Sequence, residues 1–356
     1  MAASMRDVAA LAGVSPRTVS NVVSGYVHVR AETRARVQKA IDELNYKPNL
    51  SARSLRLGRT GLIALAVPEI AAPYFAELAD LIQREAAARG FILLVDQTGA
   101  SRERELQVLA GYGSHVIDGL VLSPMALTLE DLEASRLDIP TVLLGERIAE
   151  GGLIHVAIDN VAAAREATEH LIASGRRRIA AVGGALNPGP ATRRMQGYEE
   201  ALAAAGLDAD PDLRVDTGPW GRTAGYRAVD ALLGRGVEVD AMFCFNDVVA
   251  QGAIRALADH GLRVPQDVAV VGWDDIEESS YATPSLTSVA PDKQAIARTT
   301  IRRLLAAVSG APPEEREVTC GYRLVVRESS AAPGPVATPA APRARTTSPP
   351  PRPRRA

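Results

Sequence analysis

The chain has 356 residues, 47% of them hydrophobic and 23% charged, which is the balance of a soluble globular protein of two or three domains. No run approaches the roughly 18 apolar residues needed to cross a bilayer, and no apolar signal segment precedes Arg6, so we expect a cytoplasmic protein without membrane contact. The net charge of −2 is uneven: residues 1–59 carry ten basic and four acidic side chains, residues 331–356 carry five arginines and no acid, and residues 60–330 are strongly acidic.

The basic first segment predicts three short helices. The first covers 6–12 and ends at Gly13; the second covers 16–23, with Ser15 as its N-cap and Pro16 where a missing N–H costs nothing. A third helix is expected over 31–45, although Arg30 stands where a capping Ser, Thr or Asp is usual. Its buried stripe has apolar side chains at helical spacing: Val37, Ile41 and Leu44.

A short segment after this head predicts a small separate helix. Asn49 is a plausible cap for one to two turns over 50–56, and Gly58 ends them. Helices of this length are marginal alone, because nucleation costs more free energy than two turns return. We therefore expect residues 49–59 to form a hinge helix and linker that folds only against a partner.

From Thr60 the pattern changes to apolar strands alternating with helices, which favours parallel sheets covered on both faces. The expected strands are 62–67, 91–95, 119–122, 141–144, 156–158, 179–182, 241–245 and 268–271. The expected helices are 75–89, 102–109, 162–173, 194–205, 222–233 and 248–259.

The predicted fold class is α/β, with an all-α head over 1–48 and a body over 60–330 made of two doubly wound lobes. Lobe 1 is expected over about 60–159 and 291–318, and lobe 2 over about 160–290 and 319–330. Residues 331–356 contain eight prolines and predict a disordered tail. Cys244 and Cys320 stand in apolar surroundings and are expected to be reduced core thiols rather than a disulfide or metal site.

The head has the plan of a helix-turn-helix DNA reader. In such motifs the second helix enters the major groove, with its first residues at the base edges. Those residues include Pro16, Arg17 and Asn21; arginine suits guanine and asparagine suits adenine. The basic head on an acidic body favours contact with phosphate by the head alone. The alternative is a three-helix module that binds proteins.

Three stretches carry a family resemblance: 7–23, which reads DVAALAGVSPRTVSNVV, then Leu44–Asn49 and Ala52–Leu55. The chain closely resembles the lactose and galactose repressor (LacI/GalR) family up to about Ser330. The resemblance implies a periplasmic-binding-protein-like body and a transcriptional regulator, a repressor. It places Ser15 at the reading helix and Thr18 and Ser20 near phosphates. It also implies that the hinge helix pairs with its dimer mate in the minor groove, through Asn49, Ala52, Arg53 and the wedge Leu55.

The body is expected to bind an effector between its lobes, at the carboxyl ends of strands. Carboxylate, amide and guanidinium groups bond adjacent hydroxyls, and aromatic faces pack on sugar rings, so a carbohydrate is expected. The candidate contacts that follow strands are Tyr74, Phe75, Ser123, Arg194, Trp220, Asn246 and Asp274. The resemblance supports Arg194, Asn246 and Asp274. As alternatives, Asp247 or Asp275 caps the following helix, and Trp220 is a surface aromatic.

Two further candidate contacts depart from the family pattern. Glu146 stands where many relatives have an aspartate, and Lys293 stands where the lactose repressor has an aromatic residue. A lysine there favours an acidic or differently hydroxylated effector. Many relatives also have arginine where this chain has Asn21, so the operator's base preference does not transfer.

The remaining partners and exclusions follow from the same features. One head reads half of a two-fold site, and the tail lacks apolar heptads, so a homodimer on a pseudo-palindromic double-stranded operator is expected rather than a tetramer.

The five histidines lack metal-ligand spacing and no phosphate loop or nucleophile elbow is present, so no catalysis, metal or cofactor is expected. A periplasmic sugar-binding protein would need a signal peptide and no head. The run 175–178 is interpreted as a solvated helix end rather than a second nucleic-acid site.

Overall fold

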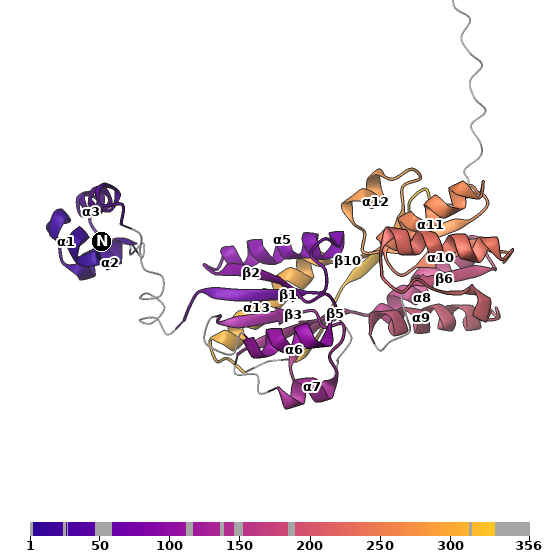
Figure 1. Ribbon diagram of the computed structural model, residues 1–356, viewed down its shortest axis with the longest axis horizontal. Coiled ribbons are helices and arrows are strands. Elements are labelled where there is room, and N and C mark those ends of the chain that lie inside the picture. The colour runs from indigo at the N-terminus through magenta and orange to yellow at the C-terminus, as the bar shows by residue number, and fades with distance from the viewer. Residues whose placement is uncertain are drawn as a thin grey trace, which may run out of the picture. The chain divides into compact units, whose positions relative to one another are not determined.

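The computed structural model describes residues 3–23, 26, 28–46, 59–111, 117–135, 139–145, 152–183, 189–312 and 315–331. Internal contacts divide the chain into two compact units. Unit 1 comprises Met1–Asn160, Pro188–Pro190 and Pro291–Tyr322, and unit 2 comprises Val161–Asn187, Ala191–Ala290 and Arg323–Ala356. The helical head and the two α/β sheets are shown in Figure 1. The predicted hinge helix and the tail lie outside the described residues.

Three helices form the head: α1 (Met5–Ala12), α2 (Pro16–Val23) and α3 (Ala31–Glu43). Ser4 caps α1, and Gly13 ends it in a left-handed conformation with φ 63°. The head has its own apolar core around Val8, Val19 and Val37, all fully buried. Arg30 gives α3 no side-chain cap, as predicted, and α3 ends at Glu43, two residues before the predicted end.

The sheet of unit 1 has the order β11-β5-β4-β3-β1-β2, and its described strand pairs are parallel. Its strands are β1 (Leu62–Val67), β2 (Ile92–Gln97), β3 (Gly119–Leu122), β4 (Thr141–Leu144), β5 (Ile154–Ile158) and β11 (Glu317–Cys320). Its helices are α5 (Pro73–Ala87), α6 (Arg102–Gly111), α7 (Leu129–Ala134) and α13 (Lys293–Val308). One face packs on α6 and α7, and α13 packs on β3, β4 and β5 and against α5.

The sheet of unit 2 has the order β12-β10-β9-β8-β6-β7. Its strands are β6 (Ile179–Gly183), β7 (Arg214–Asp216), β8 (Ala241–Cys244), β9 (Ala269–Trp273), β10 (Thr287–Pro291) and β12 (Tyr322–Val325). Its helices are α8 (Asn160–Ala173), α9 (Pro190–Ala204), the 3₁₀ turn η1 (Pro211–Leu213), α10 (Arg222–Gly234), α11 (Asp247–Asp259) and α12 (Glu277–Tyr281). Figure 1 shows α10 and α11 on one face and α8 and α9 on the other. Two doubly wound sheets confirm the predicted fold class.

Several elements differ from the predictions. The sequence patterns did not indicate β7, β10, β11, β12, α7, α12 or α13. Helix α9 begins at Pro190, four residues before the predicted start at Arg194. Strand β2 was predicted to be covered on both faces, but Ile92 and Val95 are 55% and 43% exposed because β2 is the edge strand.

The first described residues after the hinge are fastened to the sheet of unit 1. The Asp118 carboxylate accepts hydrogen bonds from the backbone N–H groups of Thr60 and Gly61, both at 2.7 Å, and from the Thr60 hydroxyl at 3.0 Å. The Arg59 guanidinium lies 5.8 Å from the centre of the Phe91 ring. Thr60 and Gly61 are therefore held beside β1.

Both cysteines are buried and free. Among the described helices, none is long and apolar enough to cross a membrane.

Candidate functional site

The start of α2 presents the residues predicted to read DNA. The Ser15 hydroxyl accepts the Thr18 N–H at 3.1 Å and lies 2.9 Å from the Thr18 hydroxyl, so the predicted N-cap is confirmed. Pro16 and Arg17 are exposed beside it. A capped helix start with an exposed guanidinium next to it suits insertion into a major groove.

Two other predicted positions on α2 are less open. Ser20, which the resemblance places near phosphates, is buried, with 7% of its surface exposed. Asn21 is half-buried. Several predicted site residues lie outside the described residues: Asn49, Ala52, Arg53, Leu55 and Glu146.

In unit 2, Arg194 is the centre of an aromatic cluster. It lies in α9, is 7% exposed, and its Nη1 donates a hydrogen bond to the Phe245 carbonyl at the end of β8. Its guanidinium carbon lies 4.0 Å from the centre of the Trp273 ring and 5.2 Å from that of Trp220. The predicted residues Arg194 and Trp220 are therefore brought together, at the strand ends that lead into Asn246 and Asp274.

Trp220 is a constituent of this cluster and not a surface aromatic alone. It is half-buried, packs against the core on the α10 and α11 face, and meets the Phe245 ring edge-on with centroids 6.5 Å apart. A guanidinium within about 6 Å of an aromatic ring centre is attracted to the face of that ring, and Arg194 lies within this distance of both indoles. The cluster thus combines flat apolar faces with hydrogen-bonding groups in neighbouring positions.

Asn246 and Asp247 have different roles at the start of α11. The Asn246 Oδ1 accepts the Val249 N–H at 2.8 Å, so Asn246 is the N-cap of α11. Asp247 is fully buried as the first residue of the helix. Its carboxylate accepts hydrogen bonds from Ser288 Oγ at 2.6 Å, Ser279 Oγ at 2.7 Å and the Ile276 N–H at 3.0 Å.

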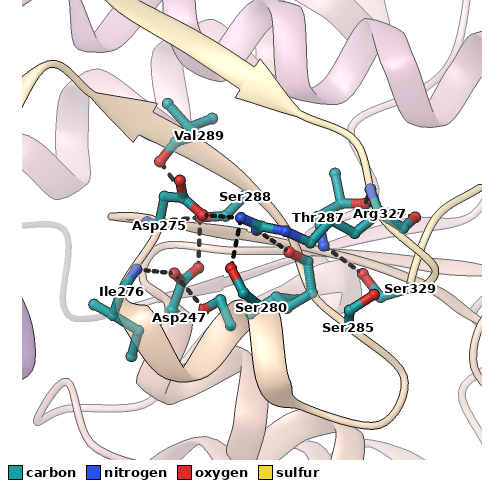
Figure 2. A network of polar contacts seen from close by, with 12 residues as sticks. Asp247, Asp275, Ile276, Ser280, Ser285, Thr287, Ser288, Val289, Arg327 and Ser329 are labelled. Carbon is teal, nitrogen blue, oxygen red and sulfur yellow. Dashed lines mark hydrogen bonds and ion pairs between the residues drawn. The ribbon is translucent and has the colours of Figure 1, made fainter.

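The alternative that Asp247 or Asp275 caps a following helix is therefore wrong. The N-cap position of α12 belongs to Ile276, which makes no side-chain cap. Asp275 forms an ion pair of 2.6 Å with Arg327, as Figure 2 shows. Asp274 and Asp275 both have positive φ, 105° and 46°, directly after β9.

In unit 1, the predicted contacts gather at the starts of α5 and α13. Tyr74 and Phe75 lie in the first turn of α5, half-buried, with their rings edge-on at 5.2 Å. Lys293, the first residue of α13, forms an ion pair with Glu77 one turn further along α5. Ser123 is buried at the end of β3, where its N–H bonds the Ala66 carbonyl.

Sequence reasoning missed three residues at these sites, Glu77, Phe245 and Trp273, and it missed the hydrogen bonds by which Asp247 holds the turn after β9. Phe245 and Trp273 each stand directly before a predicted contact, and an aromatic at the end of a buried strand was the available signal. Glu77 had no signal, because its partner Lys293 is more than two hundred positions away.

Two families match the chain. The family described as bacterial regulatory proteins, lacI family, matches residues 4–49, and the periplasmic binding protein-like domain matches residues 168–330. The first match covers all three head helices. The second covers most of unit 2 together with Pro291–Tyr322, the last segment of unit 1.

Full-length relatives extend the similarity over both units. The HTH-type transcriptional regulator CelR of Thermobifida fusca is 38% identical, over 90% of this chain and 96% of its own. The ribose operon repressor of Escherichia coli K12 is 34% identical, over 92% of this chain and 100% of its own. The transcriptional repressor PurR of Erwinia tasmaniensis is 34% identical, over 94% and 98%.

Solved structures agree with these relatives. A transcriptional regulator CelR–cellobiose complex is 34% identical, with a TM-score of 0.68 over 92% of this chain and 99% of its own. The lac repressor dimer bound to operator and an anti-inducer is 28% identical, with a TM-score of 0.80 over 93% and 99%. With its helix-turn-helix head and its two parallel sheets, this chain belongs to the lacI family of bacterial transcriptional regulators.

Proposed function

We propose that the chain represses transcription from a pseudo-palindromic operator, and that a carbohydrate bound by the body controls its affinity for that DNA. The observation that carries the effector class is the Arg194 cluster. It places the half-buried Trp220 ring beside a guanidinium, which the buried Trp273 supports from its other side, and the neighbouring Asn246 and Asp274 add polar groups; aromatic and hydrogen-bonding groups of this kind recognise sugar rings and their hydroxyls. The relative solved with cellobiose supports the same class.

Of the two alternatives that Lys293 suggested, an acidic or a differently hydroxylated effector, the unit 1 residues support the neutral, differently hydroxylated one. The Lys293 ammonium is paired with the Glu77 carboxylate, and only 14% of its side chain is exposed. Its charge is therefore balanced within unit 1. A neutral sugar fits such a surface without leaving a buried charge unpaired.

Intrinsic fluorescence tests the effector class directly. The chain has only two tryptophans, and both lie beside Arg194. Cellobiose, ribose, other neutral sugars and nucleobases are titrated into the full chain while tryptophan emission is recorded, and thermal unfolding is measured in parallel. A saturable emission change with a neutral sugar, together with a raised melting temperature, supports the proposal. A response to nucleobases and to no sugar rejects the carbohydrate class.

A homodimer is part of the same proposal. Strand β2 presents Ile92, Leu94 and Val95 at the edge of its sheet, each more than a third exposed. Apolar side chains on an unpaired sheet edge are typical of surfaces that a second copy covers. A two-fold pair of heads would then match the two halves of the operator.

A further inference from the structure

The buried carboxyl group of Asp247 accepts hydrogen bonds from residues in and around the turn that follows β9. Its three hydrogen-bond donors come from separate elements: Ile276 in the turn, Ser279 in α12 and Ser288 in β10. A Cβ on Gly272 would lie 2.2 Å from Asp247 Oδ1, so β9 can approach the carboxylate only with glycine there. The last residues of β9 and the turn are thus built around this one side chain.

The turn itself has a backbone that needs to be held. Asp274 and Asp275 are consecutive non-glycine residues with φ of 105° and 46°. Such conformations cost free energy and persist only where surrounding contacts fix them. Asp274 is a proposed effector contact, so whatever fixes this turn also fixes that contact.

Arg327 holds the turn from the other side. Its Nη2 lies 2.6 Å from Asp275 Oδ1 and donates to Ser280 Oγ at 3.0 Å, while its Nη1 donates to the Leu286 carbonyl at 2.7 Å. The Arg327 and Asp275 side chains are 17% and 15% exposed, so the pair is largely shielded from water. The Asp275 carboxylate that it pairs with lies near the Asp247 carboxylate (Figure 2).

Ser288 contacts both Asp247 and the backbone of Asp275. Its hydroxyl donates to Asp247 Oδ1 at 2.6 Å and accepts the Asp275 N–H at 3.0 Å. The neighbouring Asp274 N–H bonds the Val289 carbonyl of the same strand at 2.9 Å. Three successive backbone N–H groups, those of Asp274, Asp275 and Ile276, therefore have fixed acceptors.

We propose that Asp247 and Arg327 are positioning residues for the effector site, which set the left-handed turn at Asp274–Asp275 and so govern effector affinity without contacting the effector. The inference rests on the proposed carbohydrate function for its ligand readout. The turn can also be observed without ligand, so the two claims are separable.

The experiment compares the full-length parent with Asp247→Asn, Ser288→Ala, Arg327→Met and Arg327→Lys. The matched control is Asp267→Asn, because Asp267 precedes β9 at its other end and also bonds a backbone N–H and a guanidinium, both of Arg263. Hydrogen exchange is followed over residues 273–278 without ligand. Cellobiose binding is measured by tryptophan emission, and operator binding without sugar by fluorescence anisotropy.

Asp247→Asn replaces the oxygen that accepts the Ile276 N–H and the Ser279 hydroxyl with an NH₂ group, and Arg327→Met removes the guanidinium, so both variants should show exchange about tenfold faster over 273–278 and cellobiose affinity about tenfold weaker. Operator affinity should stay within about twofold of the parent, a split that general loss of stability would not produce. Arg327→Lys should recover part of the sugar affinity, since it keeps the charge but not the fork. Ser288→Ala loses a single hydroxyl and serves if Asp247→Asn does not fold.

Exchange over 273–278 equal to that of Asp267→Asn would overturn the inference. So would faster exchange with unchanged sugar affinity, because the turn would then have no part in sensing. If the parent binds no sugar, the carbohydrate proposal fails, and the exchange comparison alone decides whether these residues hold the turn.

Discussion

The Lys293 ammonium on α13 is paired with the Glu77 carboxylate on α5, and this pair joins the starts of two helices that carry proposed effector contacts. The Glu77 carboxylate neutralises the charge of Lys293, which the sequence alone suggested to be an isolated cation. The charge preference of the site therefore depends on Glu77, a residue with no sequence signal of its own.

Glu77→Gln should raise the affinity for an anionic sugar such as glucuronate relative to glucose, by about fivefold, because Lys293 loses its counter-charge in a partly buried place. Glu85→Gln is the control: Glu85 lies on the same helix and pairs with Arg89. Calorimetric titration of both sugars measures the ratio. An unchanged ratio in Glu77→Gln would mean that Lys293 does not face the effector.

Arg17→Ala should cost about 1–3 kcal/mol of operator binding and relax specificity at one symmetric base pair. The basis is the exposure of Arg17 beside the capped start of α2. Selection from random duplexes gives the operator, and binding to single-base variants is then compared with Arg6→Ala, an exposed arginine on α1. Equal losses on all sequences would instead make Arg17 a phosphate contact.

Asp118→Asn should weaken the link between sugar binding and DNA binding. Its carboxylate fastens Thr60 and Gly61, the first residues after the predicted hinge, so a looser attachment should transmit less of any change in unit 1. We expect the ratio of operator affinities without and with sugar to fall by about fivefold, within the usual range of allosteric coupling. Sugar affinity should stay near that of the parent and of the surface variant Asp80→Asn. A ratio equal to the parent's would show that this anchor is not part of the coupling.

Leu94→Asp should convert a dimer into monomers and weaken operator binding, since it places a charge within the exposed apolar edge of β2. Sedimentation velocity measures the mass of the assembly. Gln97→Asp adds the same charge at an exposed polar residue of the same strand and should leave the dimer intact. A dimer that survives Leu94→Asp places the interface elsewhere.

The free energy of unfolding should depend on pH through the titration of Asp247. Burial raises the pKa of Asp247 to about 7, and nearby Asp275 adds to the rise, while the hydrogen bonds from Ser288, Ser279 and Ile276 oppose it. A carboxyl with a raised folded-state pKa contributes stability below its ordinary value of 3.8 and loses it as pH rises through 7. Relative to Asp247→Asn, the parent should therefore lose on the order of 4 kcal/mol of unfolding free energy between pH 4 and 8. Urea unfolding at a series of pH values measures this difference, and a flat difference contradicts it.

Local chemistry made the head predictable from the sequence. Ser15 and Pro16 mark the start of α2, and Gly13 supplies the left-handed turn before it, so short-range signals were sufficient. The apolar runs of β3 and β4 were equally clear, because every residue in them is buried. Strand β7 was missed because it is three residues long, with charged residues at both ends.

The candidate site was predictable only in part, since its contacts join distant segments. The strand ends indicated Arg194 and Trp220 as candidate contacts of one site, and the structure brings these two together, but nothing indicated the Trp273 ring that also contacts the guanidinium. Asn246, and not Asp247, caps α11, while Asp247 bonds the hydroxyls of Ser279 and Ser288, about thirty and forty positions later. No periodicity in the sequence reports such a partner.

Arg327 also constrains the length of the chain around it. Between β11, which ends at Cys320 in unit 1, and Arg327, the chain makes its last passage into unit 2 and forms β12. A residue added or removed within 321–326 would shift the guanidinium by about 3.3 Å along the strand, more than the 2.6 Å that separates it from Asp275. Point substitutions at exposed positions of 321–326 should therefore be tolerated far better than insertions or deletions. The ion pair with Asp275 would thus constrain the number of residues between β11 and Arg327.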